Sequence, residues 1–262
     1  MNNISINGYD LYIVVNDNGN APRPFNFSTD FPTTGTAECN YLNNIRKLSP
    51  PQIDTDGDGI TDDLDLDNDN DGILNTVENN GFSPFGDEDG DGIVNAEDVI
   101  DNGTGDGSLT DYTDADFNGI PDVFDRDGDG IINMIDLDAD NDGILDLSES
   151  GQTTGTDTNN DGMLDGSVGF DGVPDSVQPG PNDGAVNYTL LDSDGDTIPN
   201  YIDLDSDGDS CFDSIEGDEN VFANYIKNDG SISYPDSGGV SSDGIPNLVN
   251  NGGYGDIGGD LA

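Results

Sequence analysis

Hydrophobic residues are spread thinly along most of this chain. Beyond residue 50 they recur one at a time among acidic residues and glycines, chiefly at positions seven and eleven of a twelve-residue pattern. Single apolar residues spaced in this way allow small contacts between neighbouring turns but no continuous core. The pattern therefore predicts a mostly irregular fold with little regular secondary structure.

Residues 1–50 differ from the rest. The run YDLYIVV, residues 9–15, has strand composition and is followed by a turn signal, NDNG. A second short strand around residues 25–31 is interrupted by prolines, and residues 40–48 could form one helical turn. We predict a β-rich N-terminal segment, which fits either the end of a preceding β domain or a small β cap.

The remaining chain, from residue 51, is organised around the pattern DxDxDGxxDxxD. In its first copy, residues 54–65, carboxylates stand at positions one, three, five, nine and twelve, with glycine at six and isoleucine at seven. Ca²⁺ takes about six to eight oxygens, which alternate carboxylates, the position-seven carbonyl and a two-oxygen carboxylate at position twelve supply. The glycine lets the backbone reverse, so both halves of the loop reach one ion. Without an ion, the five carboxylates would repel one another. Each turn thus predicts a calcium site.

Eight complete turns share this register, and six of them pair into three blocks, residues 54–79, 125–150 and 192–217. Asp125 closes one turn and opens the next, so its carboxylate is expected to bridge two ions. The predicted ligands, turn by turn, are Asp54, Asp56, Asp58, Ile60, Asp62 and Asp65; Asp67, Asp69, Asp71, Ile73, Asn75 and Glu78; Asp87, Asp89, Asp91, Ile93, Asn95 and Asp98; Asp114, Asp116, Asn118, Ile120, Asp122 and Asp125; Asp125, Asp127, Asp129, Ile131, Asn133 and Asp136; Asp138, Asp140, Asp142, Ile144, Asp146 and Glu149; Asp192, Asp194, Asp196, Ile198, Asn200 and Asp203; Asp205, Asp207, Asp209, Cys211, Asp213 and Glu216.

Other interpretations of the pattern fit less well. A solvated acidic linker would not place glycine after the third aspartate, and an aliphatic residue after that glycine, again and again. An EF-hand or dockerin needs a helix beside each loop, and the thirteen-residue spacing of paired turns leaves no room for one. The turn at Asp87 could pass for a dockerin loop by itself, but residues 99–113 cannot form an apolar helix. Magnesium is disfavoured because it prefers a tighter octahedron and keeps its waters.

In this register the turns resemble thrombospondin type 3 repeats, in the cysteine-poor form found in large bacterial surface proteins. The repeats are assigned to residues 51–217. The resemblance implies a calcium-wrapped, nearly structureless backbone around a string of ions, used in stalks and adhesins. The chain lacks the regular cysteines of the animal repeats. Thr197 and Ser210 also replace glycine at position six, where a Cβ has a steric cost if φ is positive, so the third block is expected to bind more weakly.

Further segments look like incomplete turns. One has oxygen ligands at Asp157, Asn159, Asp161 and Asp165, but its twelfth residue is Val168, which cannot ligate. Shorter fragments surround Asp171 and Asp243, and whether they hold ions stays open. Residues 218–262 are predicted to form a degenerate C-terminal cap, because terminal repeats are commonly atypical. We therefore expect about eight to eleven Ca²⁺ ions.

The charge balance is extreme. The 262 residues include 57 acidic and 5 basic ones and no histidine, which gives a formal net charge of -52. Such a chain should avoid nucleic acid and anionic membranes. Its hydrophobic content of 31% and its 37 glycines predict disorder without metal. Metal binding then supplies the free energy of folding.

Ion supply also predicts location. Loops of this kind in extracellular modules bind Ca²⁺ at about 0.1 to 1 mM, which the cytosol cannot provide, so we expect a secreted or cell-surface protein. With no signal peptide or transmembrane run in the sequence, the chain is expected to be a piece of a larger surface protein with neighbouring domains. Cys39 and Cys211 could form a disulfide in that compartment. Because Cys211 occupies a position-seven slot, a buried free thiol fits nearly as well.

The function expected first is structural: a calcium-dependent stalk or spacer within an adhesin-like protein. The alternative is a module that uses calcium to bind a glycan or protein partner, or to self-associate into filaments. An enzyme is not expected, because the chain has no histidine and no core large enough for a dry pocket that would tune paired carboxylates. The natural contacts for the alternative are aromatic residues outside the loops: Phe82, Phe85, Tyr112, Phe117, Phe170 and Tyr188.

Overall fold

The computed structural model describes residues 11–14, 45–48, 53–87, 93–99, 113–216, 221–232 and 238–250. The chain divides into two compact units, Met1–Gln52 and Ile53–Ala262. The second unit takes in both the acidic turns and the C-terminal segment. Among the described residues, none belongs to a helix that is long and apolar enough to span a bilayer.

In the first unit, strand β1 (Leu11–Val14) pairs antiparallel with strand β2 (Ile45–Leu48), with Leu11 opposite Leu48. The helical turn suggested for residues 40–48 is wrong over Ile45–Leu48, where the chain is extended. The second strand expected around residues 25–31 lies outside the described residues. A β-rich domain over residues 1–50 therefore stays a prediction, since only these two strands of it are described.

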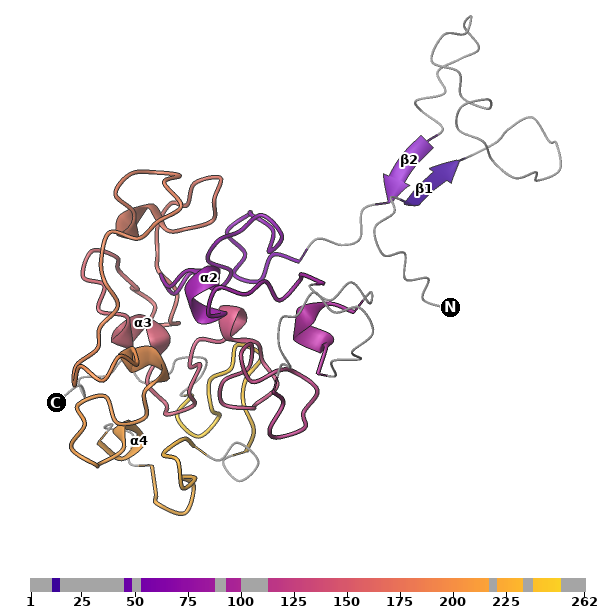
Figure 1. Ribbon diagram of the computed structural model, residues 1–262. Coiled ribbons are helices and arrows are strands. Elements are labelled where there is room, and N and C mark those ends of the chain that lie inside the picture. The colour runs from indigo at the N-terminus through magenta and orange to yellow at the C-terminus, as the bar shows by residue number, and fades with distance from the viewer. Residues whose placement is uncertain are drawn as a thin grey trace, which may run out of the picture. The chain divides into compact units, whose positions relative to one another are not determined.

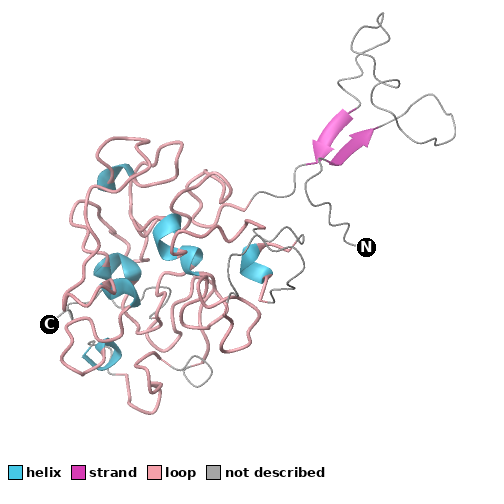
Figure 2. Ribbon diagram, viewed as in Figure 1, coloured by secondary structure: helices cyan, strands magenta, loops and turns pink. Residues whose placement is uncertain are grey.

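The second unit is mostly irregular, as the spacing of its apolar residues predicts (Figure 1, Figure 2). No strand occurs in its described part. Its regular elements are single turns of helix, and most of them cover positions nine to twelve of an acidic turn, a stretch too short to extend further. They are α2 (Asn75–Glu78), η2 (Asn95–Glu97), η3 (Asn133–Ile135), α3 (Asp146–Glu149), η4 (Asp175–Val177), η5 (Asn200–Ile202) and α4 (Asp213–Glu216).

Position six has positive φ in both glycine and non-glycine turns. Gly59 has φ of 103°, and Thr197 and Ser210, which replace glycine in the third block, have φ of 88° and 78°. The backbone reversal is thus kept in the third block even though a Cβ is present there. The steric cost anticipated from the sequence applies at these two residues.

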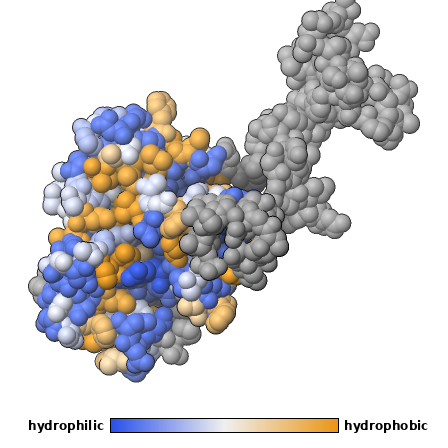
Figure 3. Space-filling view, in the orientation of Figure 1, coloured by the Kyte–Doolittle hydropathy of each residue, from blue (hydrophilic) through white to orange (hydrophobic). Residues whose placement is uncertain are grey.

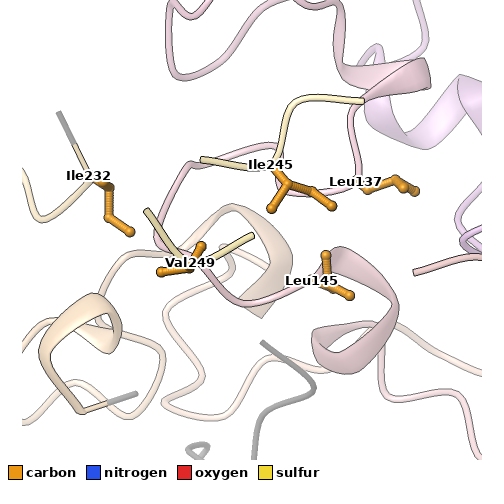
Figure 4. Close-up of a cluster of buried hydrophobic side chains, with 5 residues drawn as sticks. All are labelled: Leu137, Leu145, Ile232, Ile245 and Val249. Carbon is orange, nitrogen blue, oxygen red and sulfur yellow. The ribbon is translucent and has the colours of Figure 1, made fainter. Parts of the chain in front are cut away.

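Among the described residues, the buried apolar side chains form small separate clusters. On the face that Figure 3 shows, hydrophobic residues lie intermixed with hydrophilic ones. Figure 4 shows the first cluster, in which Ile232, Ile245 and Val249 pack on Leu137 and Leu145. The other clusters gather Leu147, Leu164, Val173 and Val177, and Ile73, Ala139 and Tyr201.

These clusters join segments that are far apart in the sequence. In the first of them, residues of the C-terminal segment pack on the middle block. The C-terminal segment also contacts the third block, where the Ser214 hydroxyl donates to the carbonyl oxygen of Gly230 at 2.6 Å. It therefore lies against two blocks.

Two incomplete turns dock on the Asp-Leu-Asp junctions of earlier blocks. The N–H of Leu66 donates to the carbonyl oxygen of Asp171, and the N–H of Leu137 donates to that of Asp243, both at 2.9 Å. A second contact accompanies each docking, because Leu164 donates to Asn70 at 2.7 Å and Ile232 donates to Asn141 at 2.6 Å. The segment after the second block thus folds back onto the first block, and the segment after the third block folds back onto the second.

The third block has no such cover among the described residues. The N–H of Leu204, which is equivalent to Leu66 and Leu137, finds no backbone acceptor there. Accordingly, Asp203 and Asp205 are only half-buried, whereas Asp65 and Asp67 of the first block are buried. Docking of the incomplete turns therefore accounts for the burial of the junction carboxylates.

A single methyl group should disturb this docking. Gly172 has φ of 79°, and a Cβ on it would lie 1.8 Å from Oδ1 of Asp65; Gly195 has the same φ, with nothing within 4 Å. We expect Gly195→Ala to lower the free energy of unfolding in calcium by about 1 kcal/mol, the cost of a left-handed conformation. Gly172→Ala should lower it by a further ~2 kcal/mol or more, because the docked turn must shift. Urea unfolding followed by circular dichroism measures both, and equal losses would contradict the docking.

Candidate metal centre

Each acidic turn is held by hydrogen bonds from its own backbone to some of its carboxylates. The N–H of position seven donates to the side chain at position five, as from Ile73 to Oδ1 of Asp71 at 2.6 Å. The N–H of position five donates to position three, as from Asp129 to Oδ1 of Asp127 at 3.0 Å. The chain therefore curls around its own carboxylates, and an oxygen at positions three and five is engaged in shaping the loop.

Position nine closes the turn. Its side-chain oxygen accepts the N–H of position two, as when Oδ1 of Asn133 accepts from Arg126 at 2.9 Å. The same contact is made by Asp62, Asn75, Asp122, Asp146, Asp165, Asn200 and Asp213. The structure thus gives position nine a structural role in every turn where both residues are described, which sequence reasoning had not assigned. Whether these side chains also ligate stays a prediction.

The acidic side chains of single turns converge. Ligand atoms of Asp54, Asp56 and Asp58 lie within 4.8 Å of one another. The same holds for Asp67, Asp69 and Asp71, for Asp114, Asp116 and Asp122, and for Asp125, Asp127 and Asp129. Such groups can hold a metal ion, and the positions that converge include the predicted one, three and five. Asp89 and Asp91 lie outside the described residues.

Many of these oxygens are buried and have no hydrogen-bond partner. In Asp69, Asp127 and Asp140 one oxygen accepts a backbone N–H while Oδ2 is orphaned, and in Glu78 and Glu149 both oxygens are. Glu149 has no solvent exposure at all. An orphaned buried carboxylate costs several kcal/mol, so a cation at these positions fits the structure.

Burial also raises the pKa of these acids. The pKa of Asp56 and that of Asp65 rise to about 7, mainly because burial disfavours the charged form and also because neighbouring aspartates repel it. The pKa values of Glu78, Asp138 and Glu149 lie well above their ordinary range for the same two reasons. Near neutral pH, these groups need either a proton or a metal ion.

The position-seven carbonyl distinguishes complete turns from docked ones. Among the described residues, no hydrogen bond reaches the carbonyl oxygen of Ile60, Ile73, Ile120, Ile131 or Ile144, so each of these oxygens can serve an ion. In the docked turns the equivalent carbonyl is engaged: that of Val173 accepts from Gln178 Nε2 at 2.8 Å, and that of Ile245 accepts from Ser241 at 2.9 Å. The docked turns thus lack the carbonyl ligand that the complete turns offer.

Asp125 is expected to bridge two ions, and Cys211 to form a disulfide or a buried free thiol. Both oxygens of Asp125 accept hydrogen bonds, Oδ1 from Gly128 and Oδ2 from Gly130 and from the Asn118 amide. Its bridging of two ions stays a prediction. Cys211 is half-buried and its thiol is free, while its backbone N–H donates to Oδ1 of Asp209. Cys39 lies outside the described residues.

The turns differ in exposure. The acids at positions one, three and five are buried in the second turns of the first two blocks, while in the second turn of the third block Asp205 and Asp207 are half-buried and Asp209 is exposed. Sequence reasoning missed the cross-block contacts that cause this difference. The recurrence of Asp-Gly-Val-Pro at Asp171 and Asp-Gly-Ile-Pro at Asp243 was a signal that could have indicated them.

Comparisons with protein-family models, with curated proteins and with solved structures find no match for this chain. Its function is therefore inferred from the site alone.

The raised pKa values predict how the metal-free protein responds to pH. An unfolded aspartate releases its proton near pH 3.8, whereas Asp56 and Asp65 of the folded chain hold theirs up to about 7. The folded form therefore binds more protons in this window, and its stability falls as the pH rises from about 4 to 7. We expect a larger radius of gyration by X-ray scattering at pH 8 than at pH 5.

Saturating Ca²⁺ provides the control for this experiment. The ion replaces the protons, and because ligands must be deprotonated to bind it, calcium affinity should rise with pH. The radius in calcium should then stay small at pH 8. A metal-free chain that is more compact at pH 8 than at pH 5 would contradict the assigned burial.

Proposed function

We propose that this chain is a calcium-dependent structural module, a stalk or spacer of a secreted or cell-surface bacterial protein that resembles thrombospondin type 3 repeats. One observation carries the proposal: carboxylates such as Glu78 and Glu149 are buried with both oxygens unpartnered, inside turns that bring other carboxylates to them. Unpaired charges of this kind are not tolerated in a protein interior. A bound cation removes the conflict.

The donor set favours calcium. Every ligand on offer is an oxygen, from carboxylates at positions one, three and five, from an unengaged carbonyl at position seven, and from the carboxylate at position twelve. This number and type of donors suits Ca²⁺, whereas Mg²⁺ keeps several waters and prefers fewer protein ligands. Zinc and copper sites are built mainly from sulfur and nitrogen, and the chain has no histidine.

A structural role follows from where the carboxylates and the apolar clusters lie. Most of the converging carboxylates belong to a single turn, and the apolar clusters beside them join one block to another, so bound ions would fix the blocks relative to one another. With about eight to eleven ions in place, the metal takes the part that an apolar core has in ordinary domains. The expected site of action, as part of an adhesin outside the cell, follows from the calcium supply that such weak sites need.

The alternative, a calcium-dependent binding or self-associating module, has one observation in its favour. Phe117 and Phe170 are 87% and 88% exposed, and large exposed aromatics are common contacts in interfaces. Tyr188, by contrast, is half-buried, and its hydroxyl donates to the carbonyl oxygen of Gly72 at 2.7 Å. A glycan array and sedimentation in calcium would show binding or oligomers if this alternative holds.

Removing calcium tests the structural proposal. In excess chelator at pH 8, the second unit should lose the circular dichroism signal that it has in calcium. Its radius of gyration from X-ray scattering should also increase, because the buried carboxylates then have neither protons nor ions. Adding Ca²⁺ back should restore both, while Mg²⁺ at the same concentration should restore less. Isothermal titration of the stripped protein gives the ion count. A scattering profile that chelator leaves unchanged would rule the proposal out.

A further inference from the structure

Asp146 has more ligating capacity than its own turn uses. It stands at position nine of the turn that begins at Asp138, where its Oδ1 accepts the N–H of Ala139 at 3.0 Å and so closes the loop. The side chain is fully buried, and its Oδ2 has no hydrogen-bond partner. The closing role therefore accounts for one oxygen and leaves the other unexplained.

The carboxylate of Asp146 lies beside a different block. One ligand atom each of Asp146, Asp71 and Glu78 lies within 4.8 Å of the other two, and all three side chains are buried. Asp71 and Glu78 are positions five and twelve of the second turn of the first block. Oδ2 of Asp71 and both oxygens of Glu78 are also without hydrogen-bond partners. Three buried carboxylates from two blocks, each with at least one orphaned oxygen, thus meet out of contact with water.

We propose that Asp71, Glu78 and Asp146 bind one divalent cation, calcium in the setting proposed above, between the first and second blocks. This inference rests on the proposed function, because Asp71 and Glu78 belong to a turn that is itself assigned to calcium. It goes beyond that function in that Asp146 serves an ion of the neighbouring block, so the two blocks share one coordination sphere.

Position nine of the first block shows that closing a turn does not require a carboxylate. There Asn75 accepts the N–H of Asn68 at 3.0 Å through Oδ1, while its amide nitrogen donates to the carbonyl oxygen of Asp65 at 3.0 Å. An asparagine at 146 would do the same for Ala139. If Asp146 only closed its loop, its second oxygen would be left buried and unpaired, which is unfavourable.

A cation at this place would fasten the blocks where they already touch. Ile73 and Ala139, from the second turns of the two blocks, pack together with Tyr201, and α2 contacts η3. The amide of Asn133 also donates to the carbonyl oxygen of Glu78 at 3.1 Å. The ion would add an ionic link to these apolar and hydrogen-bonded contacts.

The test compares Asp146→Asn with Asp229→Asn in the full chain. Asp229 is exposed and is not among the predicted ligands, and its Oδ1 accepts from the N–H and the hydroxyl of Ser231 at 3.2 and 3.0 Å, which an asparagine oxygen can also do. Only Asp146→Asn therefore removes a buried free ligand. We expect Asp146→Asn to weaken the binding of one ion by at least about tenfold in isothermal titration. Asp229→Asn should titrate like the parent protein.

A local readout places the affected ion. Tb³⁺ takes oxygen sites suited to Ca²⁺ and emits when a nearby tyrosine absorbs light, and the chain has no tryptophan to compete. Tyr201 is buried beside Glu78, Asp146 and Asp71. Burial is the main reason that its pKa is raised, and the negative charges of these three residues raise it further. Emission excited through tyrosine should fall with Asp146→Asn and with Tyr201→Phe, and should stay unchanged with Asp229→Asn.

Each outcome has a distinct meaning. If the parent protein binds no Ca²⁺ and is indifferent to chelator, the proposed function fails. If the parent binds Ca²⁺ but the two aspartate variants titrate and emit alike, the calcium function stands and the inter-block site is overturned. If Asp146→Asn is unfolded at low calcium, recovery at high calcium supports the site, because a weakened ion still stabilises by mass action. Failure to recover at any concentration assigns Asp146 a purely structural role and overturns it as well.

Discussion

The second unit depends on how carboxylates can be buried side by side. A single ion moved out of water costs several kcal/mol, and acids placed within a few ångströms of one another add repulsion in a medium that screens poorly. Lysine and arginine cannot compensate, because 5 basic residues face 57 acidic ones. Protons could, but a pKa of about 7 for Asp56 and Asp65 leaves such groups only partly protonated at neutral pH. Several of these acidic groups could hold a cation, which would compensate their charge.

The alternation of acidic residues follows from a division of labour between the two oxygens of each side chain. Oδ1 of Asp71 fixes the N–H of Ile73, and Oδ2 is left for the interior. An asparagine can do the first task, which explains why Asn133 and Asn200 are found at position nine. It cannot supply the second charged oxygen. Positions that shape the loop therefore tolerate Asp or Asn, and positions that must also neutralise an ion favour Asp and Glu.

The local part of this structure was predictable from the sequence, and the long-range part was not. The register of the turns, the reversal at position six and the lack of long helices or strands depend on residues within thirteen positions of one another. The docking of Asp171 on Leu66 spans more than a hundred residues, and nothing in the composition of a single turn specifies it. The helical turn suggested for residues 40–48 failed for a related reason, since pairing of Ile45–Leu48 with Leu11–Val14 decides its conformation.

Docking also separates the blocks energetically. Cover by an incomplete turn buries Asp65 and Asp136, which makes the metal-free state of those blocks costly and the attraction to an ion stronger. Asp203 of the third block, without such cover among the described residues, is half-buried and keeps contact with water. Its turns also have a Cβ at position six. Both differences act in the same direction: ions in the first two blocks should be coupled to folding and to one another, whereas those in the third should exchange more independently. If ions are bound as proposed, burial of the junction, more than the number of acidic residues in a turn, should set how strongly each ion contributes to the fold.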